Sequence, residues 1–365
     1  MILIQDSLLV GFFVSLNFYL SPMKYSVLLV IVWVICSCKP SPPPYDLLPQ
    51  DSQTDALLIG LHAIDENIVW ASGTKSTIIY TLNGGDKWTS VIFPDTDTLQ
   101  FRDIHGWDDK NASVLSIGEG NASSIYHFNV DTGWTKTYQM PYEQGFLDAI
   151  DFWENGHGIA YGDAIDSLPF ILKTEDYGLT WYRITENMPN AGTGEGGFAS
   201  SGTCVTTCPD GKVWIGTGAN GNARIIHSND YGMAWTAYTT PMVKGDAAGI
   251  TSVRFVGKVG FMTGGDLAKK EEWTQNVFWS DTNGKSWYPL PQPKTQGALY
   301  GSGFAKIGQE YVTITCGPEG SDLSLSLGGD WTKISPDEYW TATLLPSGIG
   351  WLAGKGGKIR KLVLD

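Results

Sequence analysis

The chain has 365 residues and a formal net charge of −14 at pH 7, and 42% of its residues are hydrophobic. A chain of this length can bury a large core without disulfides. The acidic balance, with no basic cluster beyond residues 355–361, argues against a nucleic-acid partner. The sequence contains no dinucleotide fingerprint, no haem motif and no metal-ligand spacing of His and Cys, so we expect neither a cofactor nor a metal.

Residues 1–38 are predicted to be a leader rather than part of the fold. A basic start at Met23 precedes an apolar run at 27–35 and a small residue before Cys38. This order is typical of a bacterial lipoprotein signal. We therefore expect translation to start at Met23, Cys38 to carry a lipid, and the domain to sit on a membrane of the bacterial cell envelope. The alternative is an uncleaved membrane anchor, with or without residues 1–22, although the apolar run is short for a membrane span.

Residues 39–53 are predicted to form an extended tether, because 39–49 holds five prolines in eleven residues. The remaining residues, 54–365, are predicted to form one domain. Cys204 and Cys208 lie four apart in an expected strand, too far apart for a direct disulfide, and pairing of either with Cys316 stays open.

A turn motif recurs along the predicted domain, and its complete copy is Thr174 to Trp181. Here Asp176 can accept hydrogen bonds from the N–H groups of the turn, Gly178 supplies a positive φ, and Trp181 buries its ring beside the turn. The copies end at tryptophans 44 to 54 residues apart: Trp88, Trp134, Trp181, Trp235, Trp287 and Trp331. We assign a structural role, not a chemical one, to Asn83, Gly85, Trp88, Asp176, Gly178, Trp181, Asp230, Gly232, Trp235, Gly284 and Trp287.

A second repeat is a short apolar run that ends in glycine. It occurs seven times, at 68–73, 113–118, 158–162, 213–216, 260–264, 311–317 and 350–354. A period of this length with strand and turn signals predicts an all-β fold, a seven-bladed β-propeller of four-stranded antiparallel blades, with six blades as the alternative. The last repeat lacks an outer strand, and we expect the segment around Tyr45 to Gln53 to supply it and close the ring.

The turn resembles the Asp-box, Ser/Thr-x-Asp-x-Gly-x-Thr/Ser-Trp, of sialidase-like (BNR) propellers. The longer repeat, an apolar run ending in glycine followed by a strand and the Asp-box, is similar to the photosystem II stability and assembly factor family, which has many non-photosynthetic bacterial members. The resemblance covers nearly all of residues 56–362. It implies a seven-bladed propeller that works as a binding or assembly scaffold, and it implies no reaction.

The expected binding surface lies opposite the Asp-boxes. Asp-boxes connect the third and fourth strands of a blade, so the other end of the propeller carries the loops between the second and third strands and the crossings between blades. These segments are long, rich in glycine and different in each repeat, as binding loops on a rigid scaffold tend to be. Polar groups at the mouth of the channel are the usual ligand site. We predict a recognition site of Arg102, Asp103, Asp148, Asp163, Glu195, Asp266, Tyr300 and Trp340.

The favoured function is a monomeric, lipid-anchored scaffold that binds a protein or a glycan. The alternative is a glycoside hydrolase that uses a pair of carboxylates roughly 5 to 9.5 Å apart beside an aromatic ring. A sialidase is not expected, because it needs three converging arginines. Of the five arginines in the chain, Arg183 and Arg360 fall on outer or terminal strands, and no Phe-Arg-Ile-Pro motif occurs.

Overall fold

The structure, a computed structural model, describes residues 44–94, 99–269, 271–272 and 275–364. The predicted leader, with the lipid-bearing Cys38 and the alternative anchor, and the first part of the tether lie outside these residues. Among the helices that are described, none is long and apolar enough to cross a membrane.

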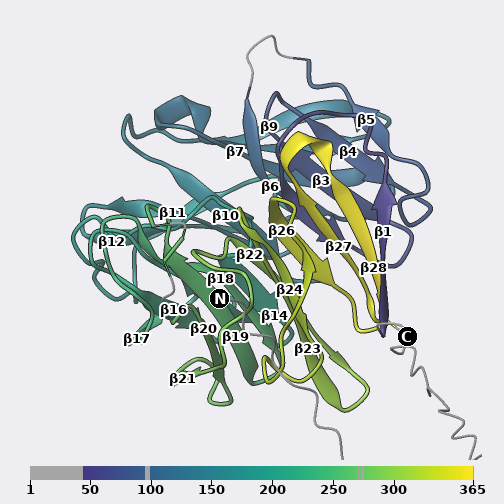
Figure 1. The fold of residues 1–365 in the computed structure, drawn as a ribbon. Coiled ribbons are helices and arrows are strands. Elements are labelled where there is room, and N and C mark those ends of the chain that lie inside the picture. The colour runs from purple at the N-terminus through teal and green to yellow at the C-terminus, as the bar shows by residue number, and fades with distance from the viewer. Residues whose placement is uncertain (1–43, 95–98, 270, 273–274, 365) are drawn as a thin grey trace, which may run out of the picture. The chain divides into compact units, whose positions relative to one another are not determined.

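Seven four-stranded antiparallel sheets form the blades of a β-propeller (Figure 1), which confirms the predicted fold and blade number. Blade 1 consists of β2 (Leu58–Ala63), β3 (Val69–Gly73), β4 (Ile78–Thr81) and β5 (Thr89–Val91). Blade 2 consists of β6 (Gln100–Gly106), β7 (Asn111–Ile117), β8 (Ser124–Asn129) and β9 (Gly133–Gln139). Blade 3 consists of β10 (Leu147–Phe152), β11 (Gly158–Ile165), β12 (Leu168–Thr174) and β13 (Tyr182–Ile184).

The chain continues in the same order through the other four blades. Blade 4 consists of β14 (Val205–Cys208), β15 (Lys212–Gly216), β16 (Arg224–Ser228) and β17 (Thr236–Thr239). Blade 5 consists of β18 (Ala248–Val256), β19 (Val259–Asp266), β20 (Val277–Ser280) and β21 (Tyr288–Pro289). Blade 6 consists of β22 (Gly301–Ile307), β23 (Glu310–Gly317), β24 (Gly320–Ser324) and β25 (Thr332–Ser335). Blade 7 consists of β26 (Tyr339–Leu344), β27 (Ile349–Gly354), β28 (Ile359–Leu364) and β1 (Tyr45–Gln50). Single 3-10 turns occur at Gly120–Ala122 and Lys355–Gly357.

The ring closes through the N-terminal strand, as the sequence predicted. β1 pairs antiparallel with β28, from Tyr45 opposite Leu364 to Gln50 opposite Ile359, and Figure 1 shows the purple β1 beside the yellow β28. The propeller therefore begins inside the proline-rich stretch, and residues 45–50 of the predicted tether belong to blade 7. This pairing joins the two ends of the chain in one sheet and leaves no open gap between the first and last blades.

The seven apolar runs ending in glycine form the second strand of each blade. These strands are buried on both faces by the neighbouring blades, which explains their continuous apolar sequence. The glycine at the end of a run allows a close backbone approach. A Cβ on Gly73 would lie 2.2 Å from the carbonyl oxygen of Leu57, and a Cβ on Gly162 would lie 2.1 Å from that of Phe146.

The core is divided among the interfaces between blades. Described residues form an apolar cluster at each interface around the ring, from blades 7 and 1 to blades 6 and 7. Between blades 4 and 5, for example, Trp214 stacks on Phe255 with ring centroids 3.8 Å apart, and Trp287 packs against the same ring. Each blade is thus held by its two neighbours, as expected for stacked repeat units.

The repeated turns that resemble Asp-boxes, called Asp-box turns from here on, connect the third and fourth strands. In blade 3, Asp176 Oδ1 accepts hydrogen bonds from the Thr180 N–H and the Thr174 hydroxyl at 2.9 and 2.8 Å, and the Trp181 indole donates to the Gly178 carbonyl at 3.0 Å. Partial burial works to raise the pKa of Asp176, but these hydrogen bonds outweigh it and hold the pKa below its usual value.

The other turns repeat this structural pattern. In blade 4, Asp230 accepts hydrogen bonds from the Ala234 N–H and the Ser228 hydroxyl at 3.0 and 2.7 Å. Trp235 and Trp287 donate to Gly232 and Gly284 of their own turns, at 3.1 and 2.9 Å. The side chain of Asn83 takes the role of the aspartate in blade 1 and accepts from the Lys87 N–H at 3.0 Å.

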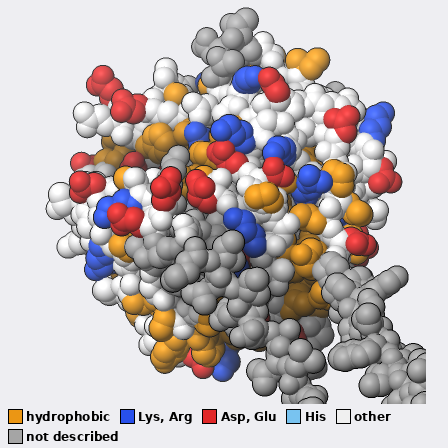
Figure 2. Space-filling model, viewed as in Figure 1, with side chains coloured by type: hydrophobic (Ala, Val, Ile, Leu, Met, Phe, Trp, Pro, Cys, Tyr) orange, Lys and Arg blue, Asp and Glu red, His pale blue; other side chains and the backbone are white. Residues whose placement is uncertain are grey.

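The surface mixes both signs of charge. On the face shown in Figure 2, acidic and basic side chains are interspersed, with hydrophobic side chains in smaller groups between them. The cysteines at positions 204, 208 and 316 are free and buried, so the pairing with Cys316 that the sequence left open is not formed.

Candidate functional site at the mouth of the channel

The crossing from blade 3 to blade 4, residues 185–204, is long and rich in Gly and Ser. Its last part, residues 197–204, is called the plug segment here, because it extends over the loop-face end of the channel. Side chains of blades 2 and 7 hold it in place. Arg102 Nη1 donates to the Ala199 carbonyl at 3.1 Å, and the Thr341 hydroxyl donates to the Ser201 carbonyl at 3.1 Å.

Two serines of the plug segment also bind blade 6. The hydroxyls of Ser200 and Ser201 donate to the Tyr300 carbonyl at 3.2 and 2.7 Å. A segment that links blades 3 and 4 is therefore fastened to blades 2, 6 and 7, and it forms one wall of a pocket at the channel mouth.

This pocket, the mouth pocket, has a volume of about 330 Å³. Residues of blades 2, 3, 5, 6 and 7 and of the plug segment contribute to it, and most of their side chains are apolar or aromatic. The lining residues are Arg102, Ile117, Phe146, Asp148, Asp163, Gly197, Phe198, Ala199, Ser200, Leu267, Tyr300 and Trp340. A mainly apolar pocket with a few fixed polar groups at the centre of a ring is a typical ligand site.

Arg102 is held rigidly at the wall of the mouth pocket. Its guanidinium lies 5.4 Å from the ring centroid of Trp340, and its Nη2 donates to Gln100 Oε1 at 2.7 Å. The Nε–H is buried and has no hydrogen-bond partner among the described residues. Burial lowers the pKa of Arg102, but a guanidinium remains a cation at any physiological pH. The pocket therefore offers a fixed positive charge.

Asp148 and Asp163 form a pair on the other side of the mouth pocket. Asp148 is only 2% exposed, and the Gly197 N–H donates to its Oδ2 at 3.1 Å. Burial, and then the negative charge of Asp163, raise the pKa of Asp148 well above its usual range. Burial raises the pKa of Asp163 to about 6. The two neighbouring carboxyls hold a proton near neutral pH, because two adjacent negative charges that are poorly solvated repel each other.

Glycine is required beside this pair. A Cβ on Gly196 would lie 1.8 Å from Asp163 Oδ1, and a Cβ on Gly197 would lie 2.6 Å from Asp148 Oδ2. The Gly-Gly step in the crossing thus allows its backbone to approach both carboxyls.

Of the eight residues predicted for recognition, five line the mouth pocket: Arg102, Asp148, Asp163, Tyr300 and Trp340. The other three lie elsewhere. Asp103 is buried and accepts hydrogen bonds from the N–H groups of Ile104 and Ile150, both at 2.8 Å, so it joins β6 to β10. Asp266 lies at the end of β19, accepts from the Ala268 N–H at 3.0 Å and is 4.0 Å from Lys269 Nζ.

Glu195 is a structural residue that anchors the crossing. It is 1% exposed and accepts from the Thr217 hydroxyl at 2.6 Å, the Gly192 N–H at 2.7 Å and Arg224 Nε at 2.9 Å, while Arg224 Nη2 forms a second contact with the same carboxylate. A carboxylate with all of its oxygens bonded has no capacity left for a ligand.

Sequence reasoning missed several residues of the mouth pocket. Seven lining residues are not among the eight predicted ones: Ile117, Phe146, Gly197, Phe198, Ala199, Ser200 and Leu267. Their apolar or small side chains carry no chemical signature. The one feature of the sequence that indicated these residues is the length and the Gly and Ser content of the crossing from blade 3 to blade 4. Within the described residues, no group of three or more His, Cys, Asp or Glu is arranged to hold a metal ion.

Comparison with known proteins supports the propeller fold and gives no information on the site. No protein-family model and no curated protein matches the chain. Among solved structures, YCF48 bound to D1 peptide has a TM-score of 0.61 at 16% identity, over 89% of this chain and 99% of that one. YCF48 from Cyanidioschyzon merolae has a TM-score of 0.61 at 14% identity, over 87% and 98%. A streptogramin B lyase has a TM-score of 0.62 at 18% identity, over 88% and 98%. At these identities the likeness shows the propeller fold alone.

Proposed function

We propose that this propeller is a non-enzymatic scaffold that binds a segment of a partner protein in the mouth pocket. The observation that carries the proposal is the pocket itself. Rigid blades hold aromatic rings around a fixed guanidinium. Such a site accepts an apolar side chain and, next to it, a backbone carbonyl or a carboxylate of the same segment. The structure of YCF48 with D1 peptide supports the proposal, because that protein of the same fold holds a peptide.

The test compares the wild-type chain with Trp340→Ala and Arg102→Gln in quantitative capture from a cell-envelope extract. Tyr288→Ala, which removes a 47% exposed ring on the outer strand β21, is the matched control. A true partner is captured by the wild type and by the control. Either pocket variant captures at least about tenfold less of it, which corresponds to a loss of about 1.4 kcal/mol of binding free energy. Overlapping peptides of that partner then locate the bound segment. If no captured protein depends on Trp340 and Arg102, the proposal fails.

A glycan is the second class of ligand for the same pocket, because aromatic rings beside carboxyl groups also fit sugars. A glycan array with the same three variants separates the two ligands. Binding of an oligosaccharide that Trp340→Ala abolishes, without capture of a protein, would favour the glycan.

The Asp148–Asp163 pair favours a second candidate function, glycoside hydrolysis. The two carboxyls lie in one pocket with the rings of Tyr300 and Trp340, and one of them holds a proton near neutral pH, as a general acid must. Against this, Asp148 is almost fully buried and Asp163 lies close enough to raise its pKa, so the two carboxyls lie side by side rather than on opposite faces of a sugar ring. Release of a reducing sugar from any substrate panel, lost in Asp163→Asn, would establish the enzyme.

The lipid anchor and the envelope location are proposals that rest on the leader sequence alone. We propose that signal cleavage before Cys38 leaves a lipidated cysteine at the new N-terminus. Metabolic labelling with a fatty-acid analogue, with Cys38→Ser as the comparison, tests this. Labelling that persists in Cys38→Ser would exclude Cys38 as the lipid-bearing residue.

A further inference from the structure

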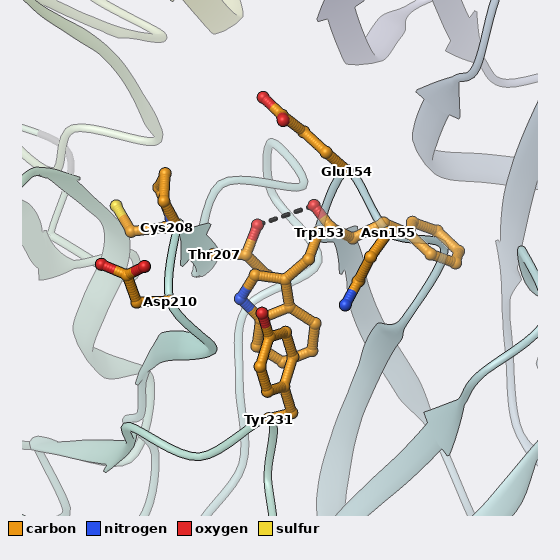
Figure 3. A pocket seen from close by; sticks show the side chains of 9 residues that line it. Trp153, Glu154, Asn155, Thr207, Cys208, Asp210 and Tyr231 are labelled. Atoms are coloured by element: carbon orange, nitrogen blue, oxygen red, sulfur yellow. Dashed lines mark hydrogen bonds between the residues drawn. The ribbon is translucent and has the colours of Figure 1, made fainter.

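A second pocket lies on the face that carries the Asp-boxes, between blades 3 and 4 (Figure 3), opposite the mouth pocket. It has a volume of about 350 Å³. Three turns build it: β10–β11, β14–β15 and the Asp-box of blade 4. The lining residues are Phe152, Trp153, Glu154, Asn155, Thr207, Cys208, Pro209, Asp210 and Tyr231. We call it the turn pocket.

The turn pocket exists because one large side chain of the repeat is replaced. In blade 3, Phe152 at the end of β10 packs on Trp107 of blade 2 with centroids 4.6 Å apart, and on Trp181 of its own turn at 5.6 Å. In blade 5, Phe255 does the same with Trp214 of blade 4 and with Trp287. Each ring also lies against the glycine of its own Asp-box, Gly178 or Gly284.

Thr207 takes this place in blade 4. The first residues of the Asp-boxes in blades 3, 4 and 5 pair with Gly158, Val213 and Gly260 of the second strands, and these pair in turn with Phe152, Thr207 and Phe255 of the first strands. Thr207 is small, and it is not among the nearest atoms to Gly232, the corresponding Asp-box glycine. The volume filled by a phenyl ring in blades 3 and 5 is therefore open in blade 4.

The aromatic wall of the turn pocket is fixed. The Trp153 indole donates to the Lys212 carbonyl at 2.9 Å, and the Tyr231 ring lies 5.1 Å from it at 61°. Tyr231 has a φ of 58°, and its N–H donates to the Gly211 carbonyl at 2.9 Å, so the turn itself holds the ring in place. Figure 3 shows the Tyr231 and Trp153 rings overlapping in the view, with Cys208 and Asp210 to one side and Asn155 to the other.

The charges around the turn pocket are negative. Glu154 and Asp210 are exposed at its rim, and no Lys or Arg is among its lining residues. Lys212 and Arg254 lie near enough to Cys208 to act on its pKa, but neither lines the pocket, and burial raises the pKa of Cys208 to about 12. Cys208 thus contributes a neutral thiol, and the two rim carboxylates make the charge of the turn pocket negative.

We propose that the turn pocket binds the cationic side chain of an arginine or lysine from a basic segment of a partner protein. The aliphatic stem of such a side chain packs on Pro209 and on the aromatic wall, where a cation also gains from the ring faces. Its charged end meets Glu154 and Asp210 at the rim. This site is independent of the mouth pocket, so the molecule has a binding surface at each end of its channel.

The test uses the full chain and the peptide Ac-Gly-Arg-Gly-NH₂, with the citrulline peptide as a neutral copy of the same shape, and saturation-transfer NMR to measure binding. We expect the arginine peptide to bind at millimolar concentration and the citrulline peptide to bind at least fivefold more weakly. The double variant Glu154→Gln with Asp210→Asn weakens binding of the arginine peptide about tenfold, because it removes both rim charges. Asp281→Asn, an exposed carboxylate of the blade 5 turn, is the control and leaves binding unchanged.

The decisive variant is Thr207→Phe, which restores the ring of blades 3 and 5. We expect it to fold with the circular dichroism spectrum of the wild type and to lose detectable binding of the arginine peptide. Equal binding of the arginine and citrulline peptides, unchanged binding in Thr207→Phe, no binding of the arginine peptide, or binding of a neutral oligosaccharide such as maltotriose in its place would each overturn the proposal. Trp340→Ala leaves this binding intact, so failure here is distinguishable from failure at the mouth pocket.

Discussion

The indole of Trp88 donates a hydrogen bond to the side-chain oxygen of Gln50, 3.2 Å away, and the amide of Gln50 in turn donates to the Gly84 carbonyl at 2.8 Å. Trp181, Trp235 and Trp287 instead donate to glycines of their own turns. The first Asp-box therefore has an additional structural role, because its hydrogen bonds connect the end of the closing strand β1 to blade 1.

Replacing Gln50 by Ala should weaken the closure. Both hydrogen bonds are lost and the Trp88 N–H loses its acceptor, so we expect the free energy of unfolding to fall by about 1–2 kcal/mol in urea denaturation. Leu48→Ala, at a 46% exposed position of the same strand, should change it by less than about 0.5 kcal/mol. Equal effects of the two variants would show that closure does not depend on Gln50.

Replacing Asp176 by Asn tests whether the negative charge of Asp176 stabilises the fold. The folded-state pKa of Asp176 is below its unfolded value, so its charge stabilises the fold above about pH 4 and the contribution is lost as the pH falls through the folded pKa. We expect wild type to be more stable than Asp176→Asn at pH 7, and the difference to shrink below pH 4. A difference that is constant with pH would contradict a role for the charge.

For Asp163 we expect the opposite dependence of stability on pH. Its pKa is raised to about 6 by burial, so ionisation between about pH 4 and pH 6 costs stability. We expect Asp163→Asn to become progressively more stable than wild type as the pH rises from 4 to 7.5, measured by urea denaturation at each pH. Asp166→Asn, in the exposed neighbouring turn, is the control and should follow the wild type.

Removing the charge of Glu195 should release the crossing without unfolding the blades. Glu195→Gln leaves the Arg224 guanidinium without its buried carboxylate, a change that costs about 3 kcal/mol or less because Arg224 is partly exposed. We expect limited proteolysis to cut within 185–204 several-fold faster, with the cut sites read by mass spectrometry. Glu186→Gln, exposed in the same crossing, should be cut at the wild-type rate. Faster cutting in both variants would contradict the anchoring role.

Local sequence determined most of the fold. The turn chemistry of Asp176 and Gly178 and the apolar runs ending in glycine depend on neighbours within a few residues, and together with the strand missing after blade 7 they predicted seven blades and the closing role of Tyr45 to Gln50. The same local signals placed the predicted binding face at the end opposite the Asp-boxes, where the mouth pocket lies.

The contents of the two pockets depended on the tertiary structure. Glu195 and Asp163 lie in neighbouring parts of the loop face, but only the folded contacts make one an anchor for Arg224 and the other a partner of Asp148. The turn pocket arises where Thr207 of one blade lies opposite Trp153 of another, and no residue spacing within a repeat predicts that contact. The physical reason is that a turn or strand is fixed by its own residues, whereas a pocket between blades is a volume left by side chains that are distant in sequence.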